Sequence, residues 1–395
     1  MSLPATLPPA SEAALTHSHS VQTMIRDKIH AAGGWIPFEQ FMNLALYAPG
    51  MGYYSSGATK LGSAGDFVTA PEISSLFSRT LAQQVIQISR QINQADILEF
   101  GAGSGKLALD LLLELEKSNA LPRKYFILEI SAELRQRQQI LFADKAPHLT
   151  HMVEWLAQLP TQFNGTILAN EVLDAMPVHI VAWHNNVLFE RGVIWKNDQF
   201  AWQDRPIQNI ELYHAASQLA SLINPNDDVT YSYVSEINLA ATYFMRSLAN
   251  ILQQGVILLI DYGFGRDEYY HPQRSQGTLM CHYRHHAHDD PFFLPGLQDI
   301  TSHMDFSAIT AAAENTELVL LGYTTQAYFL INCGITEILA QTSVEDIHSY
   351  LPQANQLQKL VSPAEMGELF KVIAFGKNFS ELLIGFKNGD MSRLL

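Results

Sequence analysis

The sequence Ile97-Leu-Glu-Phe-Gly-Ala-Gly-Ser-Gly-Lys-Leu-Ala-Leu-Asp110 joins a short apolar strand to a glycine turn and then to a helix. This order is typical of a nucleotide-type cofactor site. Glycine tolerates positive φ and carries no Cβ, so a ligand can lie against backbone N–H groups at the start of the helix. The residues of the turn that we predict to bind a cofactor are Gly101, Ala102, Gly103, Ser104 and Gly105.

The spacing of the glycines tests which cofactor the turn could hold. A dinucleotide fingerprint requires Gly or Ala at the position of Lys106, so that interpretation is weakened. A phosphate loop requires Gly at the position of Phe100 and Ser or Thr at that of Leu107, which excludes it. The remaining form, acidic-x-Gly-x-Gly-x-Gly from Glu99 to Gly105, is the one found in S-adenosylmethionine methyltransferases. The alternative is a tight turn that binds no ligand.

A second strand, Lys124–Glu129, follows a helix expected from Lys106 to about Lys117, which completes a strand-helix-strand unit. Glu129 ends this strand, where nucleotide-binding sheets place the carboxylate that binds the ribose hydroxyls. Alternatively, Glu129 is solvated or caps the next helix. The neighbouring residues that we also predict to contact the cofactor are Ile130, Trp155 and Leu156, the last two near the adenine.

The segment Asn170-Glu-Val-Leu-Asp-Ala-Met-Pro177 directly follows the fourth expected strand, Thr166–Ala169. In an open parallel sheet the first and fourth strands flank the crevice where ligands bind. We therefore predict that Asn170 contacts the cofactor, and that Glu171 and Asp174 bind a guanidinium or ammonium acceptor and take up its proton. Capping of the following helix is the alternative role for Asn170 and Asp174.

Composition narrows the class of protein. The chain has 395 residues and a net charge of -15, which disfavours nucleic acid as a partner and favours basic partners. Cys281 and Cys333 are its two cysteines, so neither a disulfide framework nor a cysteine-rich metal cluster is expected. We expect a cytoplasmic protein, because neither a secretory signal nor an apolar run long enough to span a membrane is found. A metal site is disfavoured for the histidines without regular ligand spacing, His282, His285, His286 and His288.

The order of elements predicts an α/β protein with a mostly parallel sheet. We expect a flexible arm over 1–20, an N-terminal helical cap over 21–92, and a cofactor-binding domain over 93–395. Insertions are expected at about 178–225 and 264–302, the first as an antiparallel hairpin that turns at His184-Asn-Asn186. The hairpin could extend the sheet or form a wall of the substrate site.

Six motifs together resemble the MidA family of methyltransferases, which includes the mitochondrial methyltransferase needed for respiratory complex I assembly. They are Gly65–Ser74, Glu99–Gly105, Asn170–Val178, Ile260–Gly263, Gly277–Met280 with Tyr283, and Asp299–Thr301 with Asp305–Phe306. The resemblance implies a class I, Rossmann-like sheet of seven strands with an added cap, S-adenosyl-L-methionine as donor, and protein arginine as acceptor.

The resemblance also assigns the segment before the long helix to the site, namely Asp66, Thr69, Pro71 and Glu72. The residues alone would favour a turn in which Ser74 caps that helix. Because Arg26 and Lys28 are the only basic residues among the first thirty, we expect a bacterial cytosolic member rather than a mitochondrial one.

These inferences predict an S-adenosyl-L-methionine-dependent methyltransferase that acts on a basic side chain of a protein, with arginine favoured. Glu171, with Asp174 or Asp66, is predicted to receive the cationic acceptor. Two alternatives stay open: an assembly factor that binds a partner and keeps the cofactor fold as a scaffold, and a methyltransferase of small molecules.

Overall fold

The computed structural model describes residues 7–56, 69–185, 187–224 and 230–395. The chain forms two compact units, each assembled from three separate segments. The first unit comprises Met1–Phe67, Asp174–Ala241 and Asp267–His303, and the second comprises Val68–Leu173, Thr242–Arg266 and Met304–Leu395. The expected cap over 21–92 is thus divided, because the helices that begin at Ala70 and Ser75 belong to the second unit.

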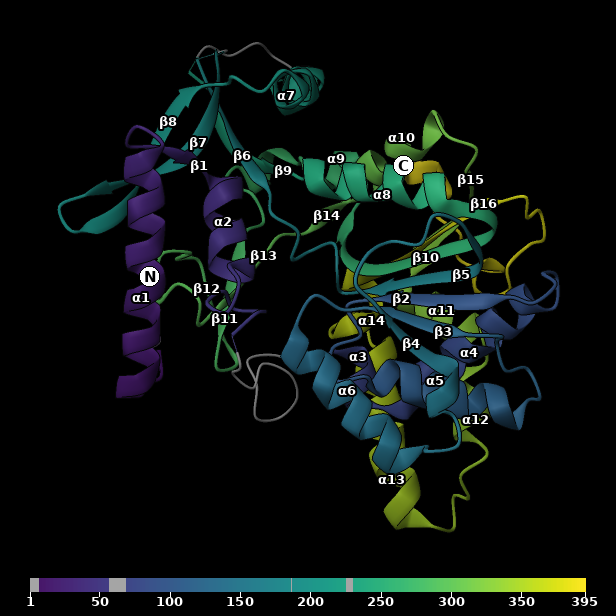
Figure 1. Ribbon diagram of the computed structural model, residues 1–395. Helices are drawn as coiled ribbons and strands as arrows, with labels where there is room; N and C mark the ends of the chain where they lie inside the picture. Colours follow the sequence, from purple (N-terminus) through teal and green to yellow (C-terminus); the bar gives the residue numbers. More distant parts are fainter. Residues whose placement is uncertain (1–6, 57–68, 186, 225–229) are drawn as a thin grey trace. The chain divides into compact units, whose positions relative to one another are not determined.

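An eight-stranded sheet is formed by the described residues of the second unit (Figure 1). Its strands run in the order β15-β16-β10-β5-β2-β3-β4, and β14 pairs with β10, so the expected seven strands are joined by one more. The pairs from β10 to β4 are parallel, whereas β16 is antiparallel to both β10 and β15. The strands are β2 Asp96–Phe100, β3 Tyr125–Leu128, β4 Val153–Leu156, β5 Phe163–Asn170, β10 Leu252–Phe264, β14 Met304–Asp305, β15 Val319–Thr325 and β16 Phe370–Lys377.

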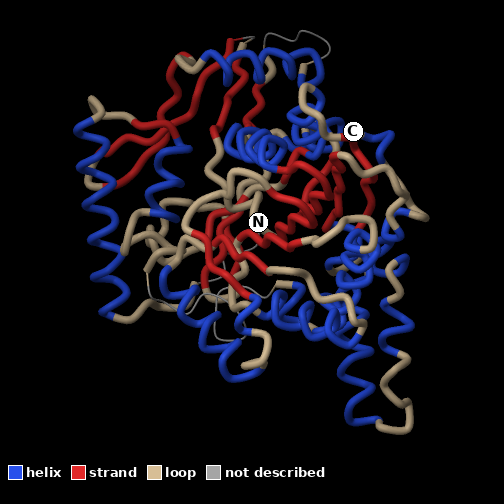
Figure 2. Tube along the Cα trace, turned by 45° about the vertical axis from the view of Figure 1, so that its right-hand side comes forward, coloured by secondary structure: helices blue, strands red, loops and turns tan. Residues whose placement is uncertain are grey.

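Helices cover both faces of this sheet. Figure 1 shows α8 and α10 on one face and α4, α5 and α12 on the other, and the tube in Figure 2 shows the same strands enclosed by helices. All five residues of β2 are buried, as a parallel strand covered on both faces requires. The helices are α3 Ala70–Ile73, α4 Ser75–Ser89, α5 Lys106–Lys117, α6 Ala132–Lys145, α8 Leu239–Ile251, α10 Phe306–Glu314, α11 Gln326–Asn332, α12 Ile335–Leu339, α13 Ile347–Val361 and α14 Met366–Leu369.

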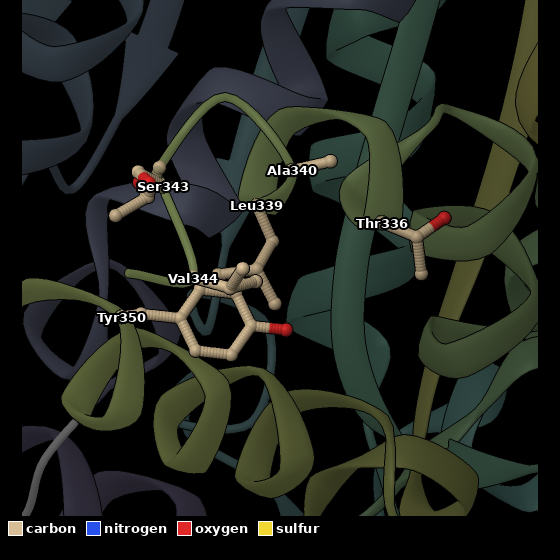
Figure 3. Close-up of a pocket in the computed structure, with 7 residues that line it drawn as sticks. Thr336, Leu339, Ala340, Ser343, Val344 and Tyr350 are labelled. Atoms are coloured by element: carbon tan, nitrogen blue, oxygen red, sulfur yellow. The ribbon is translucent and has the colours of Figure 1, made fainter. Parts of the chain in front are cut away.

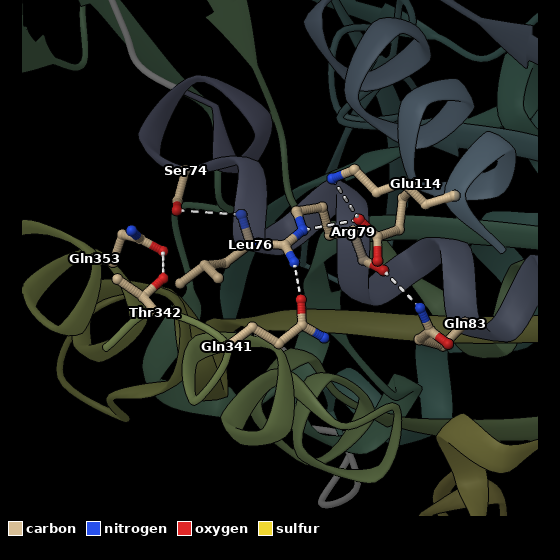
Figure 4. Close-up of polar contacts among 9 residues, drawn as sticks. Ser74, Leu76, Arg79, Gln83, Glu114, Gln341, Thr342 and Gln353 are labelled. Carbon is tan, nitrogen blue, oxygen red and sulfur yellow. Dashed lines mark hydrogen bonds and ion pairs between the residues drawn. The ribbon is translucent and has the colours of Figure 1, made fainter. Parts of the chain in front are cut away.

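A partly buried ion pair joins α4 to α5. Nε of Arg79 donates to Oε2 of Glu114 at 2.9 Å, and Arg79 also donates to the side chain of Gln341 after α12 (Figure 4). Nζ of Lys117 lies 3.4 Å from the same Glu114 oxygen. Arg79 on α4 therefore connects α5 to the segment that follows α12.

Residues 326–339 form two helices, α11 and α12, rather than one. Gly334 lies between them with φ of 85° and forms the N-cap of α12. Left-handed backbone ends the first helix there, since only glycine adopts this conformation without steric cost.

The first unit contains, among its described residues, one five-stranded and one three-stranded antiparallel sheet. The expected hairpin is present as β6 and β7, but it belongs to the five-stranded sheet and does not extend the large one. The insertion expected as a loop over 264–302 carries the three-stranded sheet. The strands are β1 Ile36–Pro37, β6 His179–His184, β7 Val187–Lys196, β8 Gln199–Pro206, β9 Ser232–Ile237, β11 Met280–Tyr283, β12 His286–His288 and β13 Asp299–Thr301.

The first helix begins within 1–20, the range that was expected to be a flexible arm. Helix α1 spans Glu12–Ala31, and Oγ of its N-cap Ser11 accepts a hydrogen bond from N of Ala14. The periodic apolar residues start late, whereas the serine cap marks the true beginning. The other helices of this unit are α2 Phe38–Tyr47, α7 Ile210–Ile223 and α9 Arg266–Tyr269, whose first residue lies in the second unit. Across the described ranges, none of the helices has the length and apolar character needed to span a membrane.

Candidate cofactor and acceptor site

The order of strands reverses at β2 and β5 in the second unit. From β2 the sheet continues through β3 to β4 on one side, and from β5 it continues to β10 on the other. Ligands of open parallel sheets bind beyond the carboxyl ends of the strands at such a reversal. The glycine turn follows β2 and Asn170 ends β5, so the two predicted groups of residues lie at this point of the sheet.

The glycine turn has left-handed backbone at three positions. The φ angles of Gly101, Gly103 and Gly105 are 60°, 55° and 86°, and Gly105 is the N-cap of α5. A Cβ atom on Gly105 would lie 3.1 Å from Cγ of Gln138. The side chain of Lys106 pairs with Asp110 one turn along α5, which explains why a long residue is tolerated there. The glycines therefore meet both a conformational and a steric requirement.

The short helix α3 contacts the glycine turn. Oγ of Ser104 donates a hydrogen bond to Oε1 of Glu72, and N of Ala70 donates to Oε1 of Glu171 at 3.3 Å. Thr69 is the N-cap of α3, and Pro71 lies in its first turn. Ser74 caps α4 by accepting from N of Leu76, so the turn expected from the residues alone is confirmed. Helix α3 thus connects the glycine turn to the end of β5.

Glu129 lies just after β3 with its side chain buried. Oε1 accepts from N of Ser131 at 2.9 Å, and Oε2 accepts from Nε2 of Gln138 at 3.3 Å. The next residue, Ile130, is 67 % exposed, although it is apolar. Trp155 is partly buried and donates its indole N–H to Oε1 of Gln138 at 2.8 Å, while O of Leu156 accepts from Arg135. A single network therefore joins the ends of β3 and β4.

Asn170 and Glu171 form a constrained turn after β5. Glu171 has φ of 52°, which is rare for a residue with a Cβ, and its N donates to O of Ile260 at 2.9 Å. Nδ2 of Asn170 donates to Oε1 of Glu171 at 3.1 Å. Within the described ranges, the buried Oδ1 of Asn170 has no hydrogen-bond partner. Strained backbone and an unsatisfied buried oxygen are both features that occur at binding sites.

Asp261 holds the same turn from the neighbouring strand. It is fully buried in β10, and its Oδ2 accepts from N of Leu173 at 2.9 Å. The carboxylate therefore fixes the chain two residues beyond Glu171.

The predicted residues are distributed unequally. Those named above from Thr69 to Glu171 all belong to the second unit. Asp66 lies outside the described residues. Asp174 belongs to the first unit, where it is buried and its O accepts from N of Ser302 at 3.0 Å.

Aromatic and acidic side chains meet near Asp174 in the first unit. The rings of Tyr47 and Tyr54 stack at 5.4 Å, and the hydroxyl of Tyr54 donates to Oδ1 of Asp299 at 2.9 Å. The hydroxyl of Tyr47 donates to O of Ala175 at 2.8 Å. Burial, followed by the charge of Asp299, raises the pKa of Tyr54 well above its ordinary value. Tyr54 is therefore a neutral hydrogen-bond donor.

The residues of the second unit fit S-adenosyl-L-methionine. The N–H groups at the start of α5 suit its carboxylate, and the carboxylates of Glu72 and Glu171 suit its ammonium and sulfonium charges. Oδ1 of Asn170 is an acceptor with unused capacity. Glu129 suits a ribose diol, and the exposed side chain of Ile130 suits an apolar base.

A metal site and a cavity elsewhere in the structure are the other candidates for a functional site. Over the described part of the chain, no group of three His, Cys, Asp or Glu residues is placed to hold a metal ion. A cavity of about 440 Å³ lies between α12 and α13, where Tyr350, Val344 and Leu339 line it (Figure 3). None of its lining residues belongs to the predicted site.

A parallel sheet with one antiparallel strand, a glycine turn after β2 and a carboxylate after β3 define the class of S-adenosyl-L-methionine-dependent methyltransferases. The chain belongs to the family described by that activity, because the family model matches residues 79–324. Its cofactor is S-adenosyl-L-methionine.

Solved and curated relatives agree with this assignment. A protein from Burkholderia thailandensis, assigned as a methyl transferase and crystallised with S-adenosyl-homocysteine, is 48% identical, with a TM-score of 0.94 over 99% of this chain and 100% of that one. The mitochondrial protein arginine methyltransferase NDUFAF7 homolog of Drosophila melanogaster is 27% identical, over 95% of this chain and 89% of its own length. NDUFAF7 of Danio rerio is 26% identical over 89% and 86%. The predicted resemblance is confirmed.

Sequence reasoning missed Gln138 and Tyr125, and it included Asp261 only within the motif Ile260–Gly263, without a role in the site. Gln138 could have been found, because Leu134, Gln138 and Phe142 recur every four residues and are the buried residues of α6. A polar residue on an apolar stripe needs a hydrogen-bond partner. The pairing of Tyr125 with a glutamate of β2 carries no comparable signal in the sequence.

Proposed function

We propose that this methyltransferase transfers a methyl group to the guanidinium group of an arginine side chain on a protein. The observation that carries the proposal is the placement of Glu171. Its carboxylate follows β5 on strained backbone, and N of Ala70 and Nδ2 of Asn170 both donate to Oε1, which orients it. A fixed carboxylate is the partner that a planar guanidinium group requires. The names of the curated relatives, at 27% and 26% identity, support the same acceptor.

We assign the cofactor contacts as follows. Gly101 to Gly105 hold the methionine part against the start of α5, with Asn170, Thr69, Pro71 and Glu72 beside it. Glu129 accepts hydrogen bonds from the ribose hydroxyls. Ile130, Trp155 and Leu156 line the adenine. These positions follow from the glycine conformations, from the contact of Glu72 with Ser104 and from the exposed apolar side chain of Ile130.

Methyl transfer requires that the chain position the acceptor nitrogen and remove its proton. The bound cofactor supplies a methyl group on a cationic sulfur, which an acceptor nitrogen attacks in line. Glu171 binds the guanidinium group, holds one of its nitrogens at the correct distance and accepts the proton that the nitrogen loses. The net charge of -15 favours the approach of a basic protein.

Radioactive methyl transfer tests the acceptor. The protein is incubated with labelled S-adenosyl-L-methionine and an extract of cells that lack it, and labelled proteins are hydrolysed to amino acids. Methylated arginine is the expected product. Label in another amino acid would contradict the arginine assignment, and label only in small molecules would show a small-molecule methyltransferase.

The variant Glu171→Ala separates catalysis from a scaffold role. We expect methyl transfer to fall by about 100-fold or more, the contribution of a positioned proton acceptor, while S-adenosylhomocysteine still binds. If biological activity in cells survives this loss of transfer, the chain acts as an assembly factor that keeps the cofactor fold.

A further inference from the structure

Gln138 joins the three parts of the cofactor site through one buried amide group. It lies on α6, and its side chain is fully buried. Nε2 donates to O of Gly103 at 2.9 Å and to Oε2 of Glu129 at 3.3 Å. Oε1 accepts the indole N–H of Trp155 at 2.8 Å. The glycine turn, the carboxylate after β3 and the aromatic ring of β4 thus share one partner.

The chemistry of these partners fixes the orientation of the amide. A carbonyl and a carboxylate can only accept hydrogen bonds, and an indole N–H can only donate one. Nε2 must therefore face Gly103 and Glu129, and Oε1 must face Trp155. Both amide hydrogens are then used, so rotation of the amide would break all three hydrogen bonds. Such a network makes the position of one member depend on the others.

We infer that Gln138 is a positioning residue for S-adenosyl-L-methionine, which sets the carboxylate of Glu129 relative to the glycine turn. The inference rests on the proposed assignment of Glu129 to the ribose and of Gly103 to the methionine part. It goes further by predicting that the two ends of the cofactor are recognised together. Gly105 adds a steric reason, because a Cβ on that glycine would lie only 3.1 Å from Cγ of Gln138.

A positioning role for Gln138 predicts that its loss changes the KM for S-adenosyl-L-methionine but not kcat. Gln138 contacts residues assigned to the adenosine and methionine parts, and these three hydrogen bonds go to Gly103, Glu129 and Trp155 rather than to Glu171. Loss of Gln138 is therefore expected to raise the KM for S-adenosyl-L-methionine, with kcat at saturating cofactor close to that of the wild type. A defect in overall folding would lower the active fraction and hence kcat.

Two substitutions at this position form a matched pair. Gln138→Leu keeps a similar volume and removes all three hydrogen bonds. Gln138→Glu keeps the shape, but when ionised it places a negative oxygen against Glu129 and O of Gly103. When protonated, the introduced carboxyl regains one donor. Three charged residues belong to this network. Glu129 accepts from Gln138, and burial, followed by the charge of Glu129, raises the pKa of Glu99. Arg135 donates to O of Glu129.

Calorimetric titration with S-adenosylhomocysteine at pH 5.5 and pH 8 is the test, with folding of each variant checked by circular dichroism. At pH 8 we expect both variants to bind about tenfold more weakly than the wild type, the factor expected for a lost buried hydrogen bond. At pH 5.5, Gln138→Glu is expected to recover affinity relative to Gln138→Leu, because only the introduced carboxyl can be protonated. The change of the wild type with pH corrects for the titration of the other groups in the protein.

Wild-type affinity for both variants at both pH values, or a fall in kcat without a rise in KM, would overturn the inference. If both variants fail to fold, Trp155→Phe removes the donor to Oε1 and keeps the ring. It is expected to raise KM in the same way, and an unchanged KM would count against the inference. Failure of the wild type itself to bind S-adenosylhomocysteine would instead refute the cofactor assignment on which it rests.

Discussion

The hydroxyl group of Tyr125 donates a 2.7 Å hydrogen bond to Oε2 of Glu99, on the neighbouring strand of the large sheet. Glu99 is 2% exposed, and burial raises its pKa from 4.5 to about 8, against the hydrogen bond from Tyr125, which lowers it. Glu99 is therefore predominantly protonated at neutral pH. The acidic residue of the glycine motif thus acts as a neutral group before the cofactor binds.

This raised pKa predicts how stability depends on pH. The folded chain binds a proton at Glu99 more tightly than the unfolded chain, so the contribution of Glu99 is fully present below pH 4.5 and is lost as pH rises to about 8. The slope is at most about 1.4 kcal/mol per pH unit. Urea unfolding of the wild type and Glu99→Gln between pH 5 and 9 measures it. We expect the variant to gain stability relative to the wild type as pH rises, and parallel curves would contradict the assignment.

Gly105→Ala is expected to weaken cofactor binding and to destabilise the second unit. Left-handed backbone costs a residue with a Cβ about 1–2 kcal/mol, and the new atom would lie 3.1 Å from Gln138. Gly33→Ala is the matched control, since its φ is 80° and no atom lies within 4 Å of the added Cβ. Both variants are expected to lose stability, whereas only Gly105→Ala loses affinity for S-adenosylhomocysteine in calorimetry. Equal affinities would show that the turn does not contact the ligand.

Tyr54→Phe is expected to lower the free energy of unfolding by about 1–3 kcal/mol, because the buried carboxylate of Asp299 loses a hydrogen-bond donor. Tyr213→Phe provides the control, since Tyr213 is 47% exposed. Midpoints of urea unfolding measure both changes. An unchanged midpoint for Tyr54→Phe would mean that the hydrogen bond is replaced by water without cost.

Arg79→Ala is expected to lower the free energy of unfolding by about 1–3 kcal/mol, because the buried Glu114 loses its Arg79 partner while Lys117 remains near it. The double variant Arg79→Met with Glu114→Leu is expected to be more stable than Arg79→Ala, since it leaves no unpaired buried charge. Thermal unfolding compares the two. A double variant less stable than Arg79→Ala would show that the pair contributes net stability.

The sequence predicted those parts of the structure that depend on local patterns. Helix α5 was predicted over Lys106–Lys117, and β2 within one residue, because glycine spacing and apolar runs define both. The division into units could not be predicted, since three distant segments combine in each and no local pattern records such contacts. The same reason explains why the strands of the hairpin region were expected as a possible extension of the large sheet.

The prediction of site residues is likewise limited to residues that a local pattern marks. Glu129 and Glu171 could be predicted as site residues because each follows a strand of the parallel sheet, and the sheet fixes where strand ends meet. Glu72 was included through resemblance to a family, and its hydrogen bond with Ser104 supplies the physical reason. Gln138 was missed because its partners are a backbone carbonyl, a carboxylate and an indole from three different elements.

The position of β16 has a consequence for how the chain matures. Phe370–Lys377 follows the other described strands of the large sheet in the sequence, yet it lies between β10 and β15 and pairs with both. Until it arrives, two strands present unpaired backbone edges, which are sites of aggregation. The sheet can therefore close only after the chain has been synthesised as far as Lys377. A chain that stops short of Phe370 carries the whole glycine turn and all of the proposed cofactor residues, yet we expect it to be lost to degradation before it can act.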